Sequence, residues 1–275
     1  DELLPPYVVS TGKPRAVKYN GSVARLSFGP IAARKVSKWI EEGEFDVLHV
    51  HEPLAPSLSV LACWAAKGPI VATWHSSVEK SRMMLTLSKL AQTAMEKVSA
   101  RIAVSEAARA TLIKHVGGDA VVIPNGVDVS FYNPSQIQPG NFRERNSFSQ
   151  EEILFFYGGI IGHAQGLEVI LNAANLLQEN SKIQFILQGS GSEKEMLMEL
   201  KKTLKLNNVH FLEPVSKKEM PSILKSIDVA LVPLKNLPLF KGAIPSKVFE
   251  ALAMEVPLLL GVDGEARNHF IEKGK

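Results

Sequence analysis

Short apolar runs bounded by turn residues recur along the whole chain, and many of their residues are β-branched. Strands that are buried on both faces have this composition, because helices cover both sides of a parallel sheet. We therefore predict strands at residues 47–50, 70–74, 101–104, 120–123, 153–157, 183–187, 209–212, 229–232 and 257–260.

Between these runs lie stretches that we interpret as helices, at residues 32–42, 80–98, 106–115, 166–179, 193–204, 220–226 and 245–254. Strands and helices that alternate in this way predict an α/β fold with parallel sheets and helical crossovers. Ligands of such sheets bind beyond the carboxyl ends of the strands, so the chemistry is expected in the loops that follow the strands.

A polar stretch with two prolines and a glycine, residues 133–141, divides the chain. We interpret it as part of a linker and predict domains at residues 1–134 and 150–275, with a linker region at 135–149. The charge changes at the same place. Up to residue 134 there are 15 basic and 12 acidic residues, and the remainder holds 16 of each, so the net charge of +3 lies wholly in the first half.

The composition excludes several classes of protein. With 45% hydrophobic and 21% charged residues, the chain is globular rather than disordered. The single cysteine, Cys63, excludes an internal disulfide, and no cysteine–histidine cluster has zinc spacing. The net charge is too small to indicate nucleic acid, and no apolar run approaches the roughly 18 residues of a membrane span. The acidic start, Asp1 and Glu2, is unlike a signal peptide, so we expect a cytoplasmic protein.

Two glycine-rich loops, residues 158–166 and 188–193, lead from a predicted strand into a predicted helix. The free N–H groups and the dipole of a helix N-terminus favour an anion such as phosphate. One such loop often serves only for tight packing. Two of them at successive strand ends of one domain favour a phosphate-bearing ligand, and their spacing excludes a P-loop NTPase.

The order of these motifs resembles that of retaining glycosyltransferases of family 4, which have the GT-B fold of two Rossmann-like domains. Residues 7–132 are similar to phosphatidylinositol mannosyltransferases in the sequences YNGSVARL at 19–26, FDVLHVHEP at 45–53, GPIVAT at 68–73 and IPNGVD at 123–128. Residues 150–275 resemble sugar transferases of capsule and colanic-acid type in AQGLE at 164–168, LVPLK at 231–235 and GAIPSK at 242–247. The change of subfamily at the linker leads to the hypothesis of a chimera.

The resemblance implies a hexosyltransferase whose first domain binds the acceptor and whose second domain binds a nucleotide-sugar, with front-face attack guided by the departing diphosphate. It assigns catalytic roles to His75, beside the transferred sugar, and to Glu250, on the donor ribose. A histidine at a strand end is otherwise a structural hydrogen-bonding group. His49 and His51 share one face of a strand; we expect His49 to be structural and leave His51 open between a structural and a ligand-facing role.

The residues that the resemblance implies for donor binding lie at the strand ends and on the helix after Pro245; they are Gly158, Gly159, His163, Gln165, Gly189, Pro214, Val215, Ser246, Lys247 and Glu250. Three positions depart from the family. Gly242 stands where the first glutamate of Glu-x7-Glu is expected, and Gly159 and Gln165 replace an arginine and a lysine that neutralise the diphosphate. Stabilisation of the leaving group is then expected from Lys247, His163 and backbone N–H groups. No metal is expected, and the base stays open between UDP and GDP.

The resemblance also implies a lipid-linked acceptor such as phosphatidylinositol. It places Tyr19, Asn20 and Lys80 near the acceptor headgroup, and the basic cluster Arg34, Lys35 and Lys38 on an anionic membrane surface. This predicts a peripheral protein on the inner face of the plasma membrane. An ordinary solvated helix face is the alternative for the basic cluster.

Two alternative functions stay open. The match to the GT-B fold begins inside the first domain, after its first strand–helix unit, so an inactive chimeric or truncated chain without a complete site is one alternative. A non-hydrolysing nucleotide-sugar epimerase is a weaker one. It needs an acid–base carboxylate, and Glu52 is the candidate.

Overall fold

The computed structural model describes residues 7–19, 22–53, 57–75 and 88–272. The chain forms two compact units, Asp1–Pro124 and Asn125–Lys275. The division therefore falls earlier than the boundary that we expected after Pro134.

The reason for this difference is the packing of the segment that was expected to be a linker. Tyr132, Phe142 and Phe148 are buried in a core cluster of the second unit. Arg143 fastens the same segment, because its guanidinium donates to the Ser226 carbonyl at 2.8 Å and to Asp228 at 2.7 Å. Residues 125–149 are thus part of the second unit, whose core they help to form.

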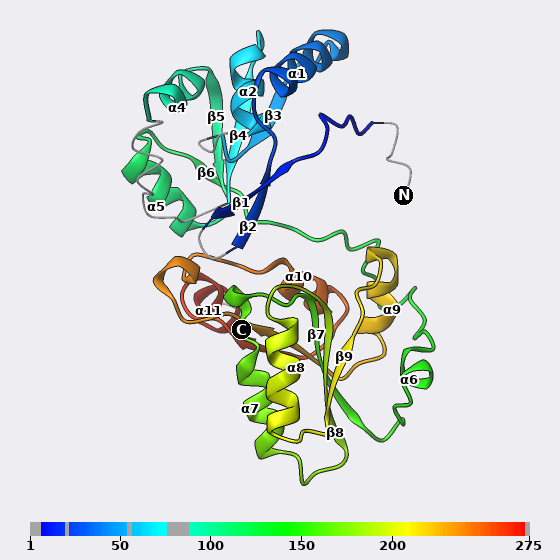
Figure 1. The fold of residues 1–275 in the computed structure, drawn as a ribbon. Coiled ribbons are helices and arrows are strands. Elements are labelled where there is room, and N and C mark those ends of the chain that lie inside the picture. The colour runs from blue at the N-terminus through cyan, green and yellow to red at the C-terminus, as the bar shows by residue number, and fades with distance from the viewer. Residues whose placement is uncertain (1–6, 20–21, 54–56, 76–87, 273–275) are drawn as a thin grey trace. The chain divides into compact units, whose positions relative to one another are not determined.

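The first unit is built on a parallel sheet of order β3-β4-β5-β6, with strands β3 (Leu48–His51), β4 (Ile70–Trp74), β5 (Val98–Ala103) and β6 (Val121–Val122). Its described helices are α1 (Pro30–Gly43), α2 (Leu58–Ala65), α4 (Ser88–Met95) and α5 (Glu106–His115). An antiparallel hairpin, β1 (Arg15–Tyr19) and β2 (Ser22–Leu26), precedes them (Figure 1). The core lies between the sheet and helices α1 and α2, around Val36, Leu61, Cys63 and Ile70.

The second unit is built on a parallel sheet of order β11-β10-β7-β8-β9. Its strands are β7 (Ile153–Ile160), β8 (Ile183–Ser190), β9 (Val209–Leu212), β10 (Val229–Pro233) and β11 (Leu258–Gly261). Its longer helices are α7 (Glu168–Leu176), α8 (Lys194–Thr203) and α10 (Ser246–Ala253), and its shorter ones are α6 (Phe142–Arg145), η1 (His163–Gln165), η2 (Lys217–Glu219), α9 (Met220–Leu224), η3 (Pro238–Phe240), α11 (Glu265–Arg267) and η4 (Asn268–Glu272).

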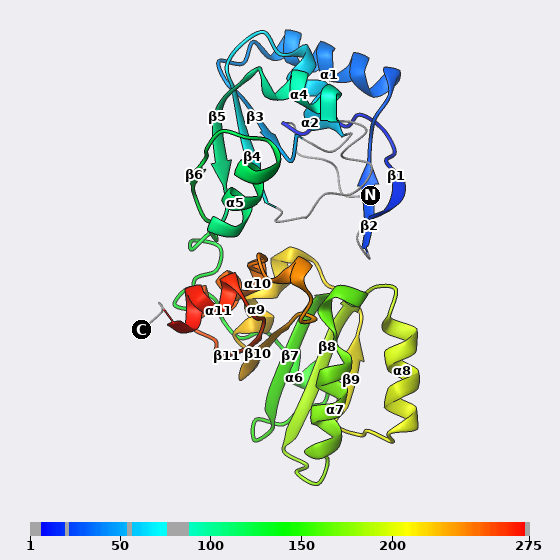
Figure 2. The same ribbon diagram turned by 90° about the vertical axis from the view of Figure 1, so that its left-hand side faces the viewer.

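Helices cover both faces of this sheet (Figures 1 and 2). Leu154 and Phe156 of β7 pack into the cluster that includes α9 and α10, whereas Phe155 and Tyr157 pack into the cluster of α7 and α8. The alternation follows from the period of two in a strand. It explains why the β7 sequence is apolar at successive positions, as the sequence pattern predicted.

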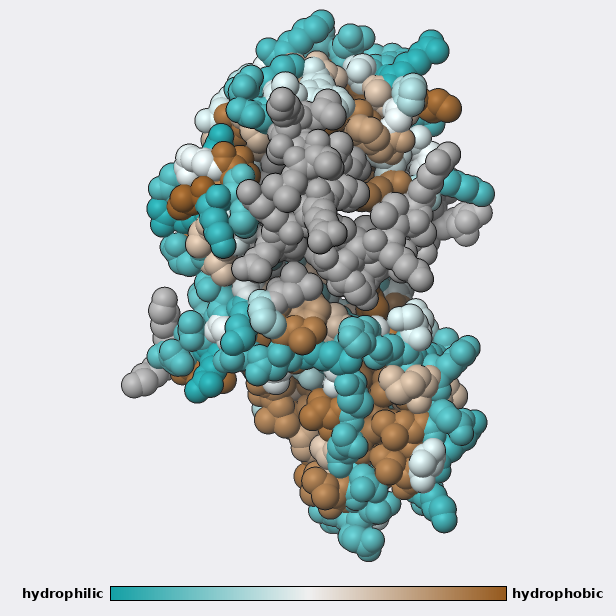
Figure 3. Space-filling view, turned by 60° about the vertical axis from the view of Figure 1, so that its left-hand side comes forward, coloured by the Kyte–Doolittle hydropathy of each residue, from teal (hydrophilic) through white to brown (hydrophobic). Residues whose placement is uncertain are grey.

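Apolar side chains also gather on the surface of the second unit, on the face that Figure 3 shows. Exposed apolar residues of this unit include Val169, Leu176 and Leu259. Among the helices of the described ranges, none is long and apolar enough to cross a membrane.

Candidate functional site

The sheet of the second unit has a gap in its strand pairing at the carboxyl end of β7. Strand order reverses at β7, because the chain runs outward through β8 and β9 and then returns to the other side with β10. β7 pairs with β8 as far as Ile160, but its pairing with β10 is recorded only at Phe155 and Phe156. A switch point of this kind is where α/β sheets bind ligands.

Lys247 extends into this gap from the first turn of α10. Its ammonium group donates to the Gly158 carbonyl at 2.9 Å and lies 4.0 Å from the centre of the Tyr157 ring. Burial lowers the pKa of Lys247 to about 8, an effect that the charge of Glu250 partly opposes. Pro245 is the N-cap of α10 rather than its first helical residue, so the helix begins one residue later than predicted.

The glycines of the two expected phosphate loops allow the ends of β7 and β8 to pack closely against each other. Gly159 and Gly189 have φ of 141° and 151°, which side chains rarely adopt. A Cβ at Gly189 would overlap the Gly159 carbonyl, and a Cβ at Gly191 would overlap the Ile161 carbonyl. Glycine is therefore needed here for the close approach of β7 and β8. A phosphate-binding role for these loops stays a prediction.

Gly159 also makes room for the lysine. A Cβ at this position would lie 2.5 Å from the Lys247 Nζ. The ammonium group of Lys247 thus takes the space beside residue 159. That the mannosyltransferases carry an arginine at this position stays an expectation from the resemblance.

His163 belongs to a cluster of charged residues at the ends of β7, β8 and β10. Its Nδ1 lies 2.9 Å from Glu193 and 3.1 Å from the Lys235 ammonium, which also pairs with Glu168 at 3.3 Å. Nδ1 can serve only one of these neighbours at a time, because a lysine ammonium only donates and a carboxylate only accepts. The sequence reasoning missed Lys235 and Glu193; their signal was their position in loops that follow predicted strands.

The side-chain oxygen of Gln165 is buried, has no hydrogen-bond partner within the described part of the chain and lies against Gly162. Its role in donor binding stays a prediction. Ser246, in contrast, is exposed at the start of α10.

Glu250 lies on α10 one turn beyond Lys247 and faces the buried hydroxyl of Tyr132. Burial first, then the charge of Glu250 and a hydrogen bond to it, raise the pKa of Tyr132 to about 12. Tyr132 precedes the predicted linker, and the sequence alone gave no reason to connect it with α10.

The loop that is expected to contact the base of the nucleotide, residues 213–215, is hydrogen-bonded to the end of β8. Gln188 donates to the Glu213 carbonyl at 3.1 Å, and Lys194 pairs with the Glu213 carboxylate at 2.7 Å. Pro214 and Val215 follow directly, so the position of their backbone depends on these two contacts.

In the first unit, the structure brings His75 together with both histidines of β3. The His51 Nδ1 lies 2.7 Å from the His75 Nε2, and the rings of His49 and His51 stack at 4.6 Å. His49 also bonds to the Thr73 hydroxyl at 2.7 Å. The prediction that His49 and His51 share one face is therefore confirmed. Glu52 accepts the His75 backbone N–H at 2.6 Å.

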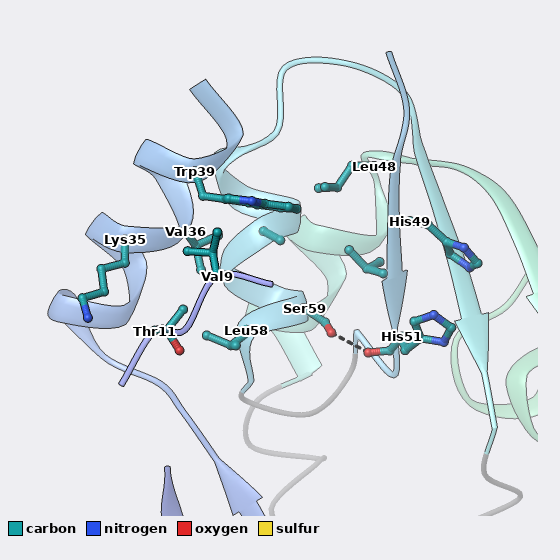
Figure 4. A pocket seen from close by; sticks show the side chains of 12 residues that line it. Val9, Thr11, Lys35, Val36, Trp39, Leu48, His49, His51, Leu58 and Ser59 are labelled. Atoms are coloured by element: carbon teal, nitrogen blue, oxygen red, sulfur yellow. Dashed lines mark hydrogen bonds between the residues drawn. The ribbon is translucent and has the colours of Figure 1, made fainter. Parts of the chain in front are cut away.

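A cavity of about 290 Å³ lies beside β3, between α1, α2 and the segment that contains Val9. Val36, Trp39 and Leu58 line it, and Lys35 lies at its rim (Figure 4). Arg34, Lys35 and Lys38 are all exposed on α1.

Some expected acceptor residues cannot be placed. Asn20 and Lys80 lie outside the described residues, and for Tyr19 the structure gives only its place in β1, paired with Ser22. Within the described ranges, no three His, Cys, Asp or Glu side chains are grouped as a metal site would require.

The comparisons with known proteins agree with this architecture. Residues 4–131 match the model of Glycosyltransferase Family 4, and residues 139–275 match the model of Glycosyl transferases group 1. The structure is similar to a glycosyltransferase from Rickettsia africae (TM-score 0.67, 18% identity, 87% of this chain and 63% of that one). It is also similar to Anabaena Alr3699/HepE in complex with UDP and glucose (TM-score 0.66, 20% identity, 88% and 65%). The chain belongs to the family 4 glycosyltransferases with the GT-B fold.

Within this family, the chain is 43% identical over 231 residues to the phosphatidyl-myo-inositol mannosyltransferase of Mycolicibacterium smegmatis, a match that covers 84% of this chain and 58% of that protein. It is 28% identical over 141 residues to WcaI of Escherichia coli, a putative colanic acid biosynthesis glycosyl transferase, over 50% of this chain and 33% of that protein.

The match to the mannosyltransferase also bears on the chimera hypothesis. It covers more of the chain than either unit contains, so one natural relative aligns across the predicted linker. A chimera is therefore not needed to explain the sequence. The chain spans about three fifths of the length of these curated relatives.

Proposed function

We propose that this chain transfers a hexosyl group from a nucleotide-sugar to a lipid-linked acceptor, with retention of the anomeric configuration. The observation that carries the proposal is the position of Lys247, a partly buried cation at the switch point of a sheet whose neighbouring loops are glycine-rich. A partly desolvated ammonium group favours an anionic ligand, and a diphosphate fits both its charge and the helix N-terminus beside it.

In the proposed donor complex, Lys247, Ser246 and backbone N–H groups of the α10 N-terminus bind the diphosphate, with His163 beside it. Glu250 accepts hydrogen bonds from the ribose, and the backbone of Pro214 and Val215 contacts the base. The named mannosyltransferase relatives support mannose as the sugar, whereas the similarity to a UDP complex supports UDP as the nucleotide. N-acetylhexosamine is the other candidate sugar. GDP and UDP are therefore both to be tested.

In the proposed reaction, the bond between the anomeric carbon and the diphosphate breaks, and the acceptor hydroxyl attacks from the same face. The departing phosphate oxygen takes the hydroxyl proton, so that no enzyme carboxylate acts as a nucleophile. His75 binds a sugar hydroxyl and stabilises the positive charge that develops at the anomeric carbon. No metal takes part in the proposed reaction.

The first unit is proposed to bind the acceptor. The relatives named phosphatidyl-myo-inositol mannosyltransferases support a phospholipid, with Tyr19, Asn20 and Lys80 near its headgroup. Exposed Arg34, Lys35 and Lys38 support attachment to anionic lipid on the cytoplasmic side of the plasma membrane. The apolar cavity beneath α1 offers space for an apolar part of the acceptor.

A transfer assay with the 275-residue chain tests the proposal. GDP-mannose, UDP-glucose and UDP-N-acetylglucosamine are each offered with phosphatidylinositol vesicles, and the anomeric configuration of the product is read by NMR. Transfer from one donor with the configuration retained supports the proposal. Inversion contradicts it, and nucleotide binding without any transfer favours the alternative of an incomplete site.

A further inference from the structure

The ring of His75 has one nitrogen occupied by another side chain. The His75 Nε2 lies 2.7 Å from the His51 Nδ1, and the two rings stack with their centres 5.0 Å apart. A hydrogen bond of this length uses one proton, which either ring can donate. Whichever ring donates, His75 Nε2 faces His51.

The backbone of His75 is held as well. Glu52 accepts the His75 N–H at 2.6 Å, and the Glu52 N–H donates to the Thr73 carbonyl at 3.0 Å. Glu52 has a φ of 50°, in the left-handed region that residues other than glycine rarely adopt. The surrounding structure must hold such a conformation in place, and it turns the Glu52 carboxylate toward the end of β4.

His51 is itself fixed by neighbours on two elements. Its carbonyl accepts the Ser59 hydroxyl at 2.5 Å (Figure 4), and its ring stacks on His49, which is bonded to Thr73. Burial lowers the pKa of His51, and the nearby His49 and His75 lower it further, while Glu52 opposes them. A neutral His51 has one N–H and one lone pair, so it can hold His75 in a defined tautomer.

We propose that His51 and Glu52 are positioning residues that fix the ring and the backbone of His75, so that His75 meets its ligand through Nδ1. The nature of that ligand, a sugar hydroxyl, rests on the proposed function. A hydroxyl both donates and accepts, so it can bond to Nδ1 in either tautomer. In this proposal His51, whose role the sequence left open, acts on the ligand through His75.

Isosteric substitutions separate the two ring nitrogens. Asparagine places its amide near the position of Nδ1, and glutamine places its amide near that of Nε2. H75N therefore keeps the ligand contact and loses the bond to His51, whereas H75Q does the reverse. We expect H75N to lose about tenfold in kcat and H75Q about a hundredfold. Equal losses, or the opposite order, would overturn the assignment of Nδ1.

The positioning role is tested at His51. H51A is expected to lower kcat on the order of tenfold with donor KM unchanged, and H51N, which keeps a polar group at the Nδ1 position, is expected to restore most of it. The kcat of E52Q, which retains an acceptor oxygen, should lie between those of H51A and H51N. H269Q, in an exposed histidine far along the chain, is the matched control. An H51A variant with wild-type kcat contradicts the proposal.

A measurement without substrate separates this proposal from the proposed function. Two-bond ¹H–¹⁵N spectra of the histidine-labelled chain report which ring nitrogen of His75 carries a proton. We expect one tautomer in the wild type and a mixture in H51A, with H269Q unchanged. An unaltered His75 signal in H51A overturns the positioning role even if the enzyme is active, and an altered signal supports it even if no transfer is found.

Discussion

The ammonium group of Lys247 lies 4.0 Å from the centre of the Tyr157 ring and donates to the carbonyl of the next residue along β7, Gly158. The Tyr157 hydroxyl is turned away, because it donates to the Ile160 carbonyl at 2.6 Å. Ring, carbonyl and ammonium group together hold one partly buried cation at the point where β7 and β10 separate. Desolvation disfavours the charged form of Lys247 and so makes its charge sensitive to pH.

Nucleotide binding should weaken at high pH through Lys247. Its pKa in the folded chain is about 8, below the 10.5 of an exposed lysine, so it loses its charge as pH rises through 8. A diphosphate requires the charged form, so its affinity should fall by up to about tenfold per pH unit above 8. Calorimetric titration with nucleoside diphosphate between pH 7 and 10 measures this. K247M should bind about a hundredfold more weakly at pH 7 and lose the pH dependence.

The same pKa predicts a trend in stability. Between pH 8 and 10.5 the unfolded chain binds more protons at this lysine than the folded chain, so the free energy of unfolding should rise with pH in that window. Urea titrations of the wild type and of K247M isolate this contribution by difference. K241M, at an exposed lysine, should keep the wild-type slope. A wild-type slope in K247M would show that desolvation of Lys247 does not cause the trend.

Tyr132 should support both the fold and the donor site through Glu250. Y132F keeps the buried ring but removes the hydroxyl that faces Glu250, so the free energy of unfolding should fall by about 1–2 kcal/mol if the two groups are hydrogen-bonded. Nucleotide affinity should fall severalfold, because Glu250 loses the partner that orients it. Y7F, at an exposed tyrosine, is the control and should change neither. A Y132F chain with wild-type stability would exclude the hydrogen bond.

Gly189 should tolerate no side chain. In G189A the new methyl group meets the Gly159 carbonyl, and the backbone stays at a φ that alanine disfavours. We expect the clash and the backbone strain each to lower the free energy of unfolding by about 1–3 kcal/mol. The midpoint of thermal unfolding should drop accordingly. Gly126 has open space around its Cα and no unusual φ, so G126A should be nearly neutral. Similar midpoints for the two variants would show that β7 and β8 do not approach this closely.

Arg143 should hold the start of the second unit in place. Its side chain is 12% exposed and donates to three carbonyls besides its ion pair with Asp228. R143A should lower the free energy of unfolding by about 2–3 kcal/mol. The nearby Arg145 is 44% exposed, forms a long pair with Glu219 and lies 6.0 Å from the centre of the Phe142 ring. R145A should therefore lower the free energy of unfolding by less than about 1 kcal/mol. Removal of residues 1–149 should also make the second unit easier to unfold. This result would contradict the interpretation of residues 135–149 as a free linker.

Much of the fold could be predicted because its strands are buried on both faces and stand out as apolar runs. Helix α2 was missed because it is apolar almost all round, with Val60, Leu61, Ala62 and Cys63 buried, and so shows no polar face. The hairpin β1–β2 was missed although Asn-Gly, a frequent hairpin turn, stands between its strands in the sequence. The boundary was misplaced because Pro and Asn also occur in segments that pack on a core.

The candidate site was predictable only where a residue follows a strand end or matches a family motif. His75 and Lys247 became candidates in this way. Tyr132 beside Glu250 and Lys235 beside His163 were not, because each pair is far apart in sequence and joined only by the tertiary fold. The approach of Lys247 from α10 to residue 159 likewise needs the three-dimensional structure to be seen.

The central claim, that the switch point of the second unit binds a nucleoside diphosphate through Lys247, is tested most directly by thermal unfolding of the 275-residue chain and of K247M with UDP, GDP and ADP. A ligand that binds the folded chain raises the midpoint according to its concentration and affinity. The account predicts a rise for the wild type with UDP or GDP and none for K247M. No rise with any nucleotide, or an equal rise in K247M, would contradict it.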